Sequence, residues 1–437
     1  MRILFVSTRD LGGGAALAAH RLAVALQKQG HEVRMLVQTK NSKEEFVVAY
    51  DSMLLPKTFT KIVRKVKNKW YNWLTLSNAK KRTLESYDKN PYDIHLGNVC
   101  IYRNLEEVFK QEQYDILHLH WVDAFVRPSD LVGVQKPIIW TLHDCTYFTG
   151  GCPHPFECKG YVNGCDKTNN CLMVGAKWMQ CYIKRNVAQR QKLYKKRDEI
   201  HFVAPSHWMA QKMRESALLR DMQISVIPNC IDTDLFTKIE KSIAKQKLGL
   251  SAHKRYIAYG AMNVLIDKNK GYDLLQKAIA GIDIPNVELL IFGATEDQLL
   301  DFGLPVTYMG NVDNNDMPLL YNAVDVMVVP SRYENLPNVA IEAMSCGTSV
   351  VAFAQGGCID IIDHKQTGYL AQPYDTTDFR EGILWCLDNS KKCLQAAIDK
   401  VNDNFSMTVV AQKYEDIIMN NWWNFDDDQL KTIERML

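Results

Sequence analysis

The stretch Ser331-Arg-Tyr-Glu-Asn-Leu-Pro-Asn-Val-Ala-Ile-Glu-Ala-Met-Ser-Cys-Gly347 follows an apolar run and decides the fold of the second half of the chain. The apolar run predicts a buried parallel strand that ends at Ser331, and the polar loop after it carries Glu334. Pro337 suits the start of a helix and Gly347 suits its end. This order places a helix N-terminus at the carboxyl end of a parallel strand, where open α/β sheets bind ligands.

The start of this helix predicts an anion site. The first amides of a helix lack intrahelical partners, and the helix dipole is positive at that end. We therefore expect a diphosphate at the helix start, contacting Asn335, Leu336, Asn338 and Val339. Glu342 lies one turn inside the helix, where its carboxylate can accept two hydrogen bonds from a ribose diol. Glu334, in the loop, would face a sugar.

Strand and helix patterns alternate on both sides of this stretch. An apolar run at 2–7 precedes a glycine-rich turn and an amphipathic helix, and the alternation starts afresh at Tyr256. Such alternation in both halves predicts two doubly wound α/β domains. A strand at 226–232 would lead into the linker between them. The expected organisation is a first domain at 1–228, a second domain at 229–406, and a helix at 407–437 that crosses back toward the first domain.

Size and composition agree with two soluble domains. The 437 residues are too many for one core of ordinary size, and 47% of them are hydrophobic against 23% charged. The net charge of +2 gives no argument for a nucleic-acid partner, and we expect none. The sequence shows neither a signal-peptide pattern nor an apolar run of about 18 residues. We therefore expect a cytoplasmic protein with reduced thiols.

The first turn of the chain, Gly12-Gly-Gly-Ala-Ala16, lets the backbone approach phosphate oxygens at a helix N-terminus. A dinucleotide fingerprint would need a small residue where Leu17 stands and an acid after the second strand, and neither is present. The turn therefore predicts a diphosphate contact through Gly13 and Gly14, without a nicotinamide site.

Two further segments carry polar residues at the expected ligand edge. Lys270 comes just before a helix start, where it can neutralise a diphosphate leaving group, and Lys268 could supply a second cation. His143 ends a buried strand, placed to hydrogen-bond or act on a hydroxyl. His118 and His120 alternate on another strand and so share one face, as structural or acceptor-cleft residues.

A cysteine-rich insert at 145–181 follows His143. Zn²⁺ needs four thiolate or imidazole ligands around one tetrahedral ion, and a long loop can supply them. The candidate ligands of a structural zinc are Cys152, Cys158, Cys165 and Cys171. Because no Cys-x-x-Cys pair occurs, disulfides and free packed thiols stay open as alternatives.

Residues 57–82 contain nine Lys or Arg, no acidic residue and several aromatic residues. This basic amphipathic composition suits peripheral contact with the anionic inner face of a membrane. The alternative is a solvated basic helix that packs its aromatic side on its own domain.

The acidic motif at 331–347 resembles the Glu–seven residues–Glu motif of glycosyltransferase family 4, as do the residues that follow it up to Ala352. The glycine-rich turn, the Lys270-Gly pair and the Thr141-x-His143-Asp stretch also resemble that family. The resemblance implies a GT-B fold, with two Rossmann-like domains facing a central cleft. It also implies sugar transfer with retention, in which Glu334 contacts the donor sugar, Glu342 the ribose, and His143 lies beside the reacting sugar.

The resemblance further implies the partners of the reaction. These are a UDP- or GDP-sugar donor and an oligosaccharide or lipid-linked acceptor, in bacterial surface polysaccharide synthesis (capsule, exopolysaccharide or lipopolysaccharide). The expected catalytic residues are His143, Glu334 and Lys270, with no cofactor required for catalysis. One departure is Leu265, where the family often has an Arg. The alternatives are a GT-B-fold sugar-nucleotide epimerase or phosphorylase, and a non-catalytic sugar-nucleotide-binding protein.

Overall fold

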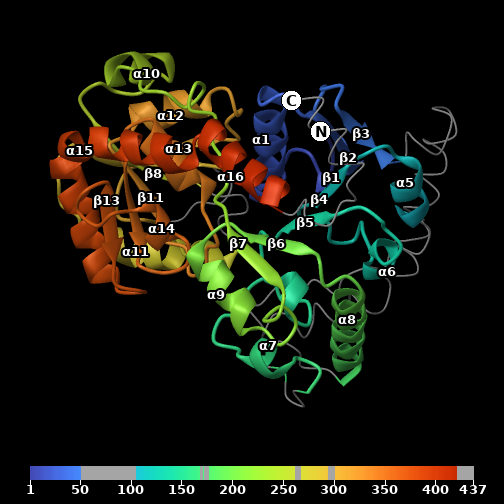
Figure 1. The fold of residues 1–437 in the computed structure, drawn as a ribbon. Coiled ribbons are helices and arrows are strands. Elements are labelled where there is room, and N and C mark those ends of the chain that lie inside the picture. Colours follow the sequence, from blue (N-terminus) through green and yellow to red (C-terminus); the bar gives the residue numbers. More distant parts are fainter. Residues whose placement is uncertain (51–104, 168–170, 172–176, 261–266, 294–300, 421–437) are drawn as a thin grey trace, which may run out of the picture.

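The computed structural model describes residues 1–50, 105–167, 171, 177–260, 267–293 and 301–420. These residues form two parallel sheets of seven and six strands, each covered by helices, which confirms the predicted two-domain GT-B architecture (Figure 1). The basic segment at 57–82 lies outside the described residues, so membrane contact there stays a prediction. Within the described ranges, no helix combines the length and the apolar content needed to cross a membrane.

The sheet of the first domain has the strand order β3-β2-β1-β4-β5-β6-β7. Its strands are β1 (Arg2–Arg9), β2 (Glu32–Thr39), β3 (Val47–Ala49), β4 (Ile116–Leu119), β5 (Ile138–Thr141), β6 (His201–Ala204) and β7 (Gln223–Val226). Strands β4 and β5 are buried along their whole length, as expected for central parallel strands covered on both faces. Their carboxyl ends therefore bring the residues that follow them, from His120 and from Leu142 onward, to one edge of the sheet.

The sheet of the second domain has the order β10-β9-β8-β11-β12-β13. Its strands are β8 (Arg255–Gly260), β9 (Val287–Phe292), β10 (Val306–Gly310), β11 (Val326–Val329), β12 (Ser349–Phe353) and β13 (Gly368–Ala371). The strand order reverses between β8 and β11, which are neighbours. Ligands of open α/β sheets bind at such a switch point, outside the carboxyl ends of the strands.

Helices connect the strands in both domains. The helices of the first domain are α1 (Gly14–Lys28), α5 (Leu105–Gln111), α6 (Pro128–Leu131), α7 (Gly160–Asn163), α8 (Lys177–Lys196) and α9 (His207–Glu215), with the 3-10 turn η1 (Thr146–Phe148). Those that follow are α10 (Lys241–Lys247), α11 (Tyr272–Ile279), α12 (Met317–Ala323), α13 (Asn338–Ser345), α14 (Cys358–Ile361), α15 (Thr376–Phe405) and α16 (Met407–Asn420), with η2 (Lys268–Lys270).

The link between the domains differs from the predicted strand at 226–232. The last strand of the first sheet, β7, ends at Val226, and the residues after it are irregular. Pro228 has no backbone N–H and cannot donate a ladder hydrogen bond, which explains why the strand stops before it. The next pairing is an isolated bridge between Ile231 and Ser406.

Helix α16 leaves the second domain and packs on the first. After the bridge at Ser406, it runs beside α1, as the red and blue helices of Figure 1 show. Its buried residues Val410, Tyr414 and Ile418 belong to one core with Phe5 of β1 and with residues of α1. The first domain is therefore completed by the end of the described chain.

We predict that Ile418→Ala lowers the free energy of unfolding by about 2–5 kcal/mol, because the lost apolar contacts leave a cavity in the core of the first domain. Ile418 is 3% exposed, whereas its neighbour Met419 is 51% exposed. The control, Met419→Ala, should change stability by less than about 0.5 kcal/mol. Denaturant titration compares the two variants, and equal losses would mean that α16 is not docked as described.

Candidate active site

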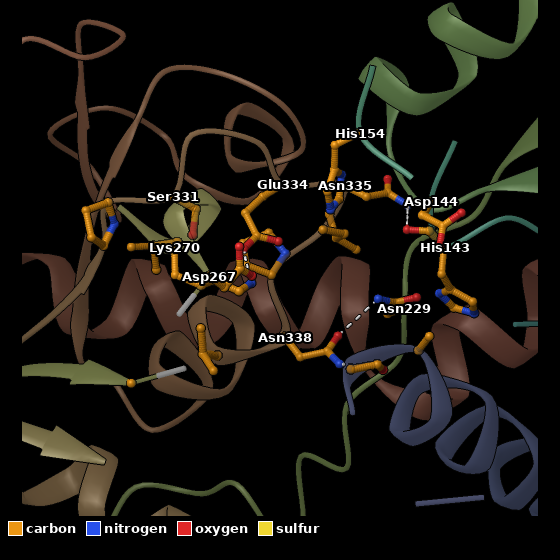
Figure 2. Close-up of a pocket in the computed structure, with 18 of the residues that line it drawn as sticks. His143, Asp144, His154, Asn229, Asp267, Lys270, Ser331, Glu334, Asn335 and Asn338 are labelled. Carbon is orange, nitrogen blue, oxygen red and sulfur yellow. Dashed lines mark hydrogen bonds and ion pairs between the residues drawn. The ribbon is translucent and has the colours of Figure 1, made fainter. Parts of the chain in front are cut away.

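A cavity of about 640 Å³ lies between the two domains. The first domain contributes the start of α1 and the residues after β4 and β5, and the second contributes the η2 turn and the segment from β11 to α13. Of the residues singled out from the sequence, the lining includes Gly14, His143, Lys270, Glu334, Asn335, Leu336, Asn338 and Val339. Figure 2 labels His143, Lys270, Glu334, Asn335 and Asn338 among the side chains that line it.

Two helix N-termini meet at this cavity. Helix α13 starts at Asn338, after Pro337 as its N-cap, and α1 starts at Gly14. The side-chain Nδ2 of Asn338 donates to the Gly14 carbonyl over 3.1 Å, and its Oδ1 accepts from Asn229 Nδ2 over 3.0 Å. The first amides of both helices lack intrahelical partners, so the junction concentrates positive potential suited to an anion.

Lys270 and Glu334 form an ion pair in the wall of the cavity. Lys270 Nζ lies 2.6 Å from Glu334 Oε1, and the two side chains are only 28% and 17% exposed. Burial opposes both charges, but the pair outweighs it: Glu334 raises the pKa of the Lys270 amine, and Lys270 lowers the pKa of the Glu334 carboxyl. Both groups therefore stay charged at neutral pH.

Asn335 ties the loop of the second domain to the first domain. Its Nδ2 donates to the carbonyls of His143 over 3.0 Å and Leu142 over 3.2 Å. Its Oδ1 accepts from the Ser206 hydroxyl over 2.9 Å. Because Asn335 follows Glu334 directly, these bonds fix the loop relative to the end of β5, where His143 lies. The sequence predicted that Asn335 contacts the diphosphate and did not reveal this bridging position between the domains.

His143 forms a hydrogen-bonded pair with His120, whose Nδ1 lies 3.0 Å from His143 Nε2. His118 lies beside His120, with ring centroids 4.4 Å apart, so both face the same side of β4. Burial lowers the pKa of His143 to about 4 against the opposing effect of Asp144. Burial and His143 lower the pKa of His118 to about 3, and burial also lowers that of His120. All three imidazoles are therefore neutral at pH 7.

Glu342 does not line the cavity. It is 5% exposed, and its two oxygens accept from Arg21 Nη2 of α1 over 2.8 Å and from the Tyr321 hydroxyl over 2.7 Å. The pair with Arg21 crosses between the two domains. An ionised carboxylate has about four lone-pair positions, so these two bonds leave Glu342 further capacity to accept.

Two other predicted donor contacts lie away from the cavity lining. Gly13 is the N-cap of α1, with a φ of 132° that favours glycine. The Lys268 side chain is exposed, and its carbonyl accepts a hydrogen bond from Arg332. Lining residues that the sequence reasoning did not propose as donor or catalytic contacts include Trp121, Asp144, His154, Asn229, Tyr259, Asp267 and Ser331. Asp144 and Ser331 lie in segments that resemble the family, which was the available signal.

Three cysteines of the insert share a small core: Cys152 packs with Ile183 and Val187, and Cys165 and Cys171 pack against them. Cys152 and Cys165 are free thiols. Burial raises the pKa of Cys152 and Cys165, so both thiols are protonated at neutral pH. Within the described ranges, no three His, Cys, Asp or Glu side chains are arranged to hold a metal ion. The zinc therefore stays a prediction.

Comparison with known proteins gives two family matches that together span both domains. The model of glycosyltransferase family 4 matches residues 12–235, and that of the glycosyl transferases group 1 matches residues 243–400. D-inositol 3-phosphate glycosyltransferase from Mycobacteroides abscessus is 32% identical over 174 residues. That match covers 37% of this chain and 38% of the relative's own length.

Two solved structures share the fold across the chain. Sucrose-phosphate synthase from Thermosynechococcus elongatus superposes with a TM-score of 0.62 at 18% identity, covering 96% of this chain and 98% of its own. Anabaena HepE in complex with UDP-glucose superposes with a TM-score of 0.59 at 17% identity, covering 96% of this chain and 100% of its own. At these identities the likeness concerns the fold alone.

The buried histidines predict a loss of stability in acid. The pKa of His118 is about 3 in the folded chain against 6.5 for the free side chain. As the pH falls, the unfolded chain therefore takes up a proton on His118 before the folded chain does. The stability that the neutral His118 contributes is complete above about pH 7 and is lost as the pH falls through 6.5. Between pH 7 and pH 5, wild type should therefore lose about 2 kcal/mol more than His118→Gln. Denaturant titration at both pH values measures this, and equal losses would contradict it.

The insert supports a direct metal test. If four thiolates bind zinc when the protein is made in cells, metal analysis of purified protein should give about one zinc per chain. Simultaneous replacement of Cys152 and Cys158 by Ser should remove it, whereas Cys346→Ser, in the second domain, should not. Less than about half a zinc per chain, with thiols that titrate as free, would end the zinc prediction.

Proposed function

The chain belongs to glycosyltransferase family 4, and on that premise we propose that it transfers a sugar from a nucleoside diphosphate-sugar to a saccharide acceptor, with retention at the anomeric carbon. The observation that carries the proposal is the junction of two helix N-termini beside the Lys270–Glu334 pair in one interdomain cavity. Such a junction suits a diphosphate with a sugar attached.

The donor would lie across the cavity, with its diphosphate between the start of α13 and the start of α1. Among the described lining residues, Lys270 is the only Lys or Arg. Helix amides must therefore supply much of the remaining stabilisation of the anion. The family often has an Arg at the position of Leu265, so this chain has no cationic side chain at that position. Because Anabaena HepE was solved with UDP-glucose, UDP-sugars are the first donors to test, followed by GDP-sugars.

The chemistry would depend on charge that grows on the leaving phosphate. The bond from the anomeric carbon to the phosphate oxygen breaks, a bond to the acceptor oxygen forms, and the acceptor's proton passes to the leaving phosphate. Lys270 and the amides of Asn338 and Val339 stabilise the phosphate, at about 3–4 kcal/mol for each well-placed donor. Lys270 has three N–H groups, so it can contact Glu334 and phosphate together. Glu334 then orients the sugar hydroxyls, and no catalytic metal takes part.

The acceptor proposed is an oligosaccharide, free or lipid-linked, in surface polysaccharide synthesis at the cytoplasmic face of the membrane. The support is the basic, aromatic composition of residues 57–82 together with the family's range of substrates. Closure of the two domains around donor and acceptor would exclude water and so favour transfer over hydrolysis.

We predict that purified protein releases nucleoside diphosphate from one class among UDP-, GDP- and ADP-sugars, and that acceptor addition yields a product with the donor's anomeric configuration. Lys270→Met should lower kcat by about 10²-fold or more, because the leaving phosphate loses its charged partner. The exposed Lys268→Met is the matched control and should retain most of the activity. NMR of the product reads the stereochemistry, and conversion of the donor without acceptor to an isomeric sugar nucleotide would indicate an epimerase.

The proposed ribose contact of Glu342 makes a separate prediction. Glu342→Gln should weaken binding of the nucleoside diphosphate by about 1.5–3 kcal/mol, because hydrogen bonds to a charged acceptor are lost. Tyr321→Phe removes a protein bond to the same carboxylate and leaves its charge, so it should weaken binding far less. Calorimetry measures both affinities. Unchanged affinity of the Gln variant would show that Glu342 does not bind the ribose and has only a structural role in its bond with Arg21.

A further inference from the structure

His120 and His143 share one hydrogen bond. Which of the two rings donates its N–H determines whether the other nitrogen of His143, Nδ1, is protonated. The two rings are inclined by 22° with centroids 5.3 Å apart, and Nδ1 of His120 lies 3.0 Å from Nε2 of His143. This geometry is that of a bond close to both ring planes. At neutral pH each imidazole is neutral and carries one N–H, so one ring donates and the other accepts.

The other nitrogen of His120 identifies the donor. His120 Nε2 is buried and has no hydrogen-bond partner among the described residues. Phe5 stacks on His120 at 14° with centroids 5.2 Å apart, so an N–H in the His120 plane would not point at the Phe5 ring face. His118 Nε2, in turn, is already bonded to the Thr141 hydroxyl over 3.0 Å.

The two arrangements of the proton therefore differ in cost. If His143 donated, His120 would carry its own proton on Nε2 and bury an N–H without an acceptor. If His120 donates from Nδ1, its Nε2 is only an unused acceptor. Orphaned buried N–H groups are rarer in folded proteins than under-satisfied acceptors, which favours the second arrangement.

We propose that His120 fixes the tautomer of His143, so that His143 carries its proton on Nδ1 and presents an N–H donor to the cavity. His143 lines the cavity, and its Nδ1 has no protein partner within the described part of the chain. His120 is thus a positioning residue. The consequence for turnover rests on the proposed function: His143 donates a hydrogen bond to an oxygen of the bound sugar or acceptor and does not remove the acceptor's proton.

The tautomer can be measured on the unliganded full chain. Protein labelled with ¹⁵N-histidine is studied at pH 7 by two-bond ¹H–¹⁵N correlation, which distinguishes a protonated from a bare ring nitrogen. Signals missing in His143→Gln assign His143. We expect a protonated Nδ1 and a bare Nε2 in His143. A protonated Nε2, with or without a proton on Nδ1, would overturn the inference, whatever the protein's activity proves to be.

Two variants of His120 test the cause. His120→Asn can place an amide N–H where Nδ1 lies, so it should keep the His143 tautomer and most of kcat. His120→Phe retains a ring of similar size without a donor, so it should lose the fixed tautomer and about tenfold in kcat, with the donor KM nearly unchanged. Thermal melting checks that both variants fold.

The two kinds of failure are distinguishable. Wild-type kcat and tautomer in the Phe variant would show that His120 does not position His143, and the inference would fall. If the Phe variant does not fold, the wild-type spectrum still decides the tautomer. If that spectrum is as expected but no sugar nucleotide turns over, the proposed function fails and the assigned tautomer stands.

Discussion

The ion pair between Lys270 and Glu334 is the constraint around which the site is built. Its two charges come from separate turns, η2 and the loop after β11, that must touch for the pair to form. Gly271 makes this contact feasible, because a Cβ there would lie 2.0 Å from the Pro330 carbonyl oxygen. Asn269 secures it by donating to the Tyr333 carbonyl over 2.8 Å. A partly buried cation is thus fixed beside a helix N-terminus, and removal of either member would leave the other charge without its partner.

The second domain meets the first through polar side chains that surround the same cavity. Asn335 contacts the end of β5, Asn338 contacts the start of α1, and Glu342 bonds with Arg21 of the same helix. These bonds couple the geometry of the loop that carries Glu334 to the position of His143. Any opening of the domains must break several of these hydrogen bonds together. The arrangement of the site residues therefore depends on how the two domains lie relative to each other.

The sequence predicted most of the fold because buried parallel strands and helix starts leave local patterns, as at 331–347 and in the Lys270-Gly turn. The predicted strand at 226–232 was wrong, because the apolar pattern there was given more weight than Pro228, which cannot donate a backbone hydrogen bond to a sheet. The sequence also could not reveal what Asn335 and Glu342 contact, since their partners lie in the other domain and depend on how the sheets face each other. The shared face of His118 and His120 followed from strand periodicity, whereas their bond to His143 required the structure.

The most direct test of this account is a crystal structure of the chain with the nucleoside diphosphate of its preferred donor. The account predicts a diphosphate within hydrogen-bond distance of Lys270 Nζ and of the Asn338 and Val339 amides, opposite the start of α1 at Gly14. A ligand bound elsewhere, or one in the cavity with Lys270 bonded to Glu334 alone, would contradict it.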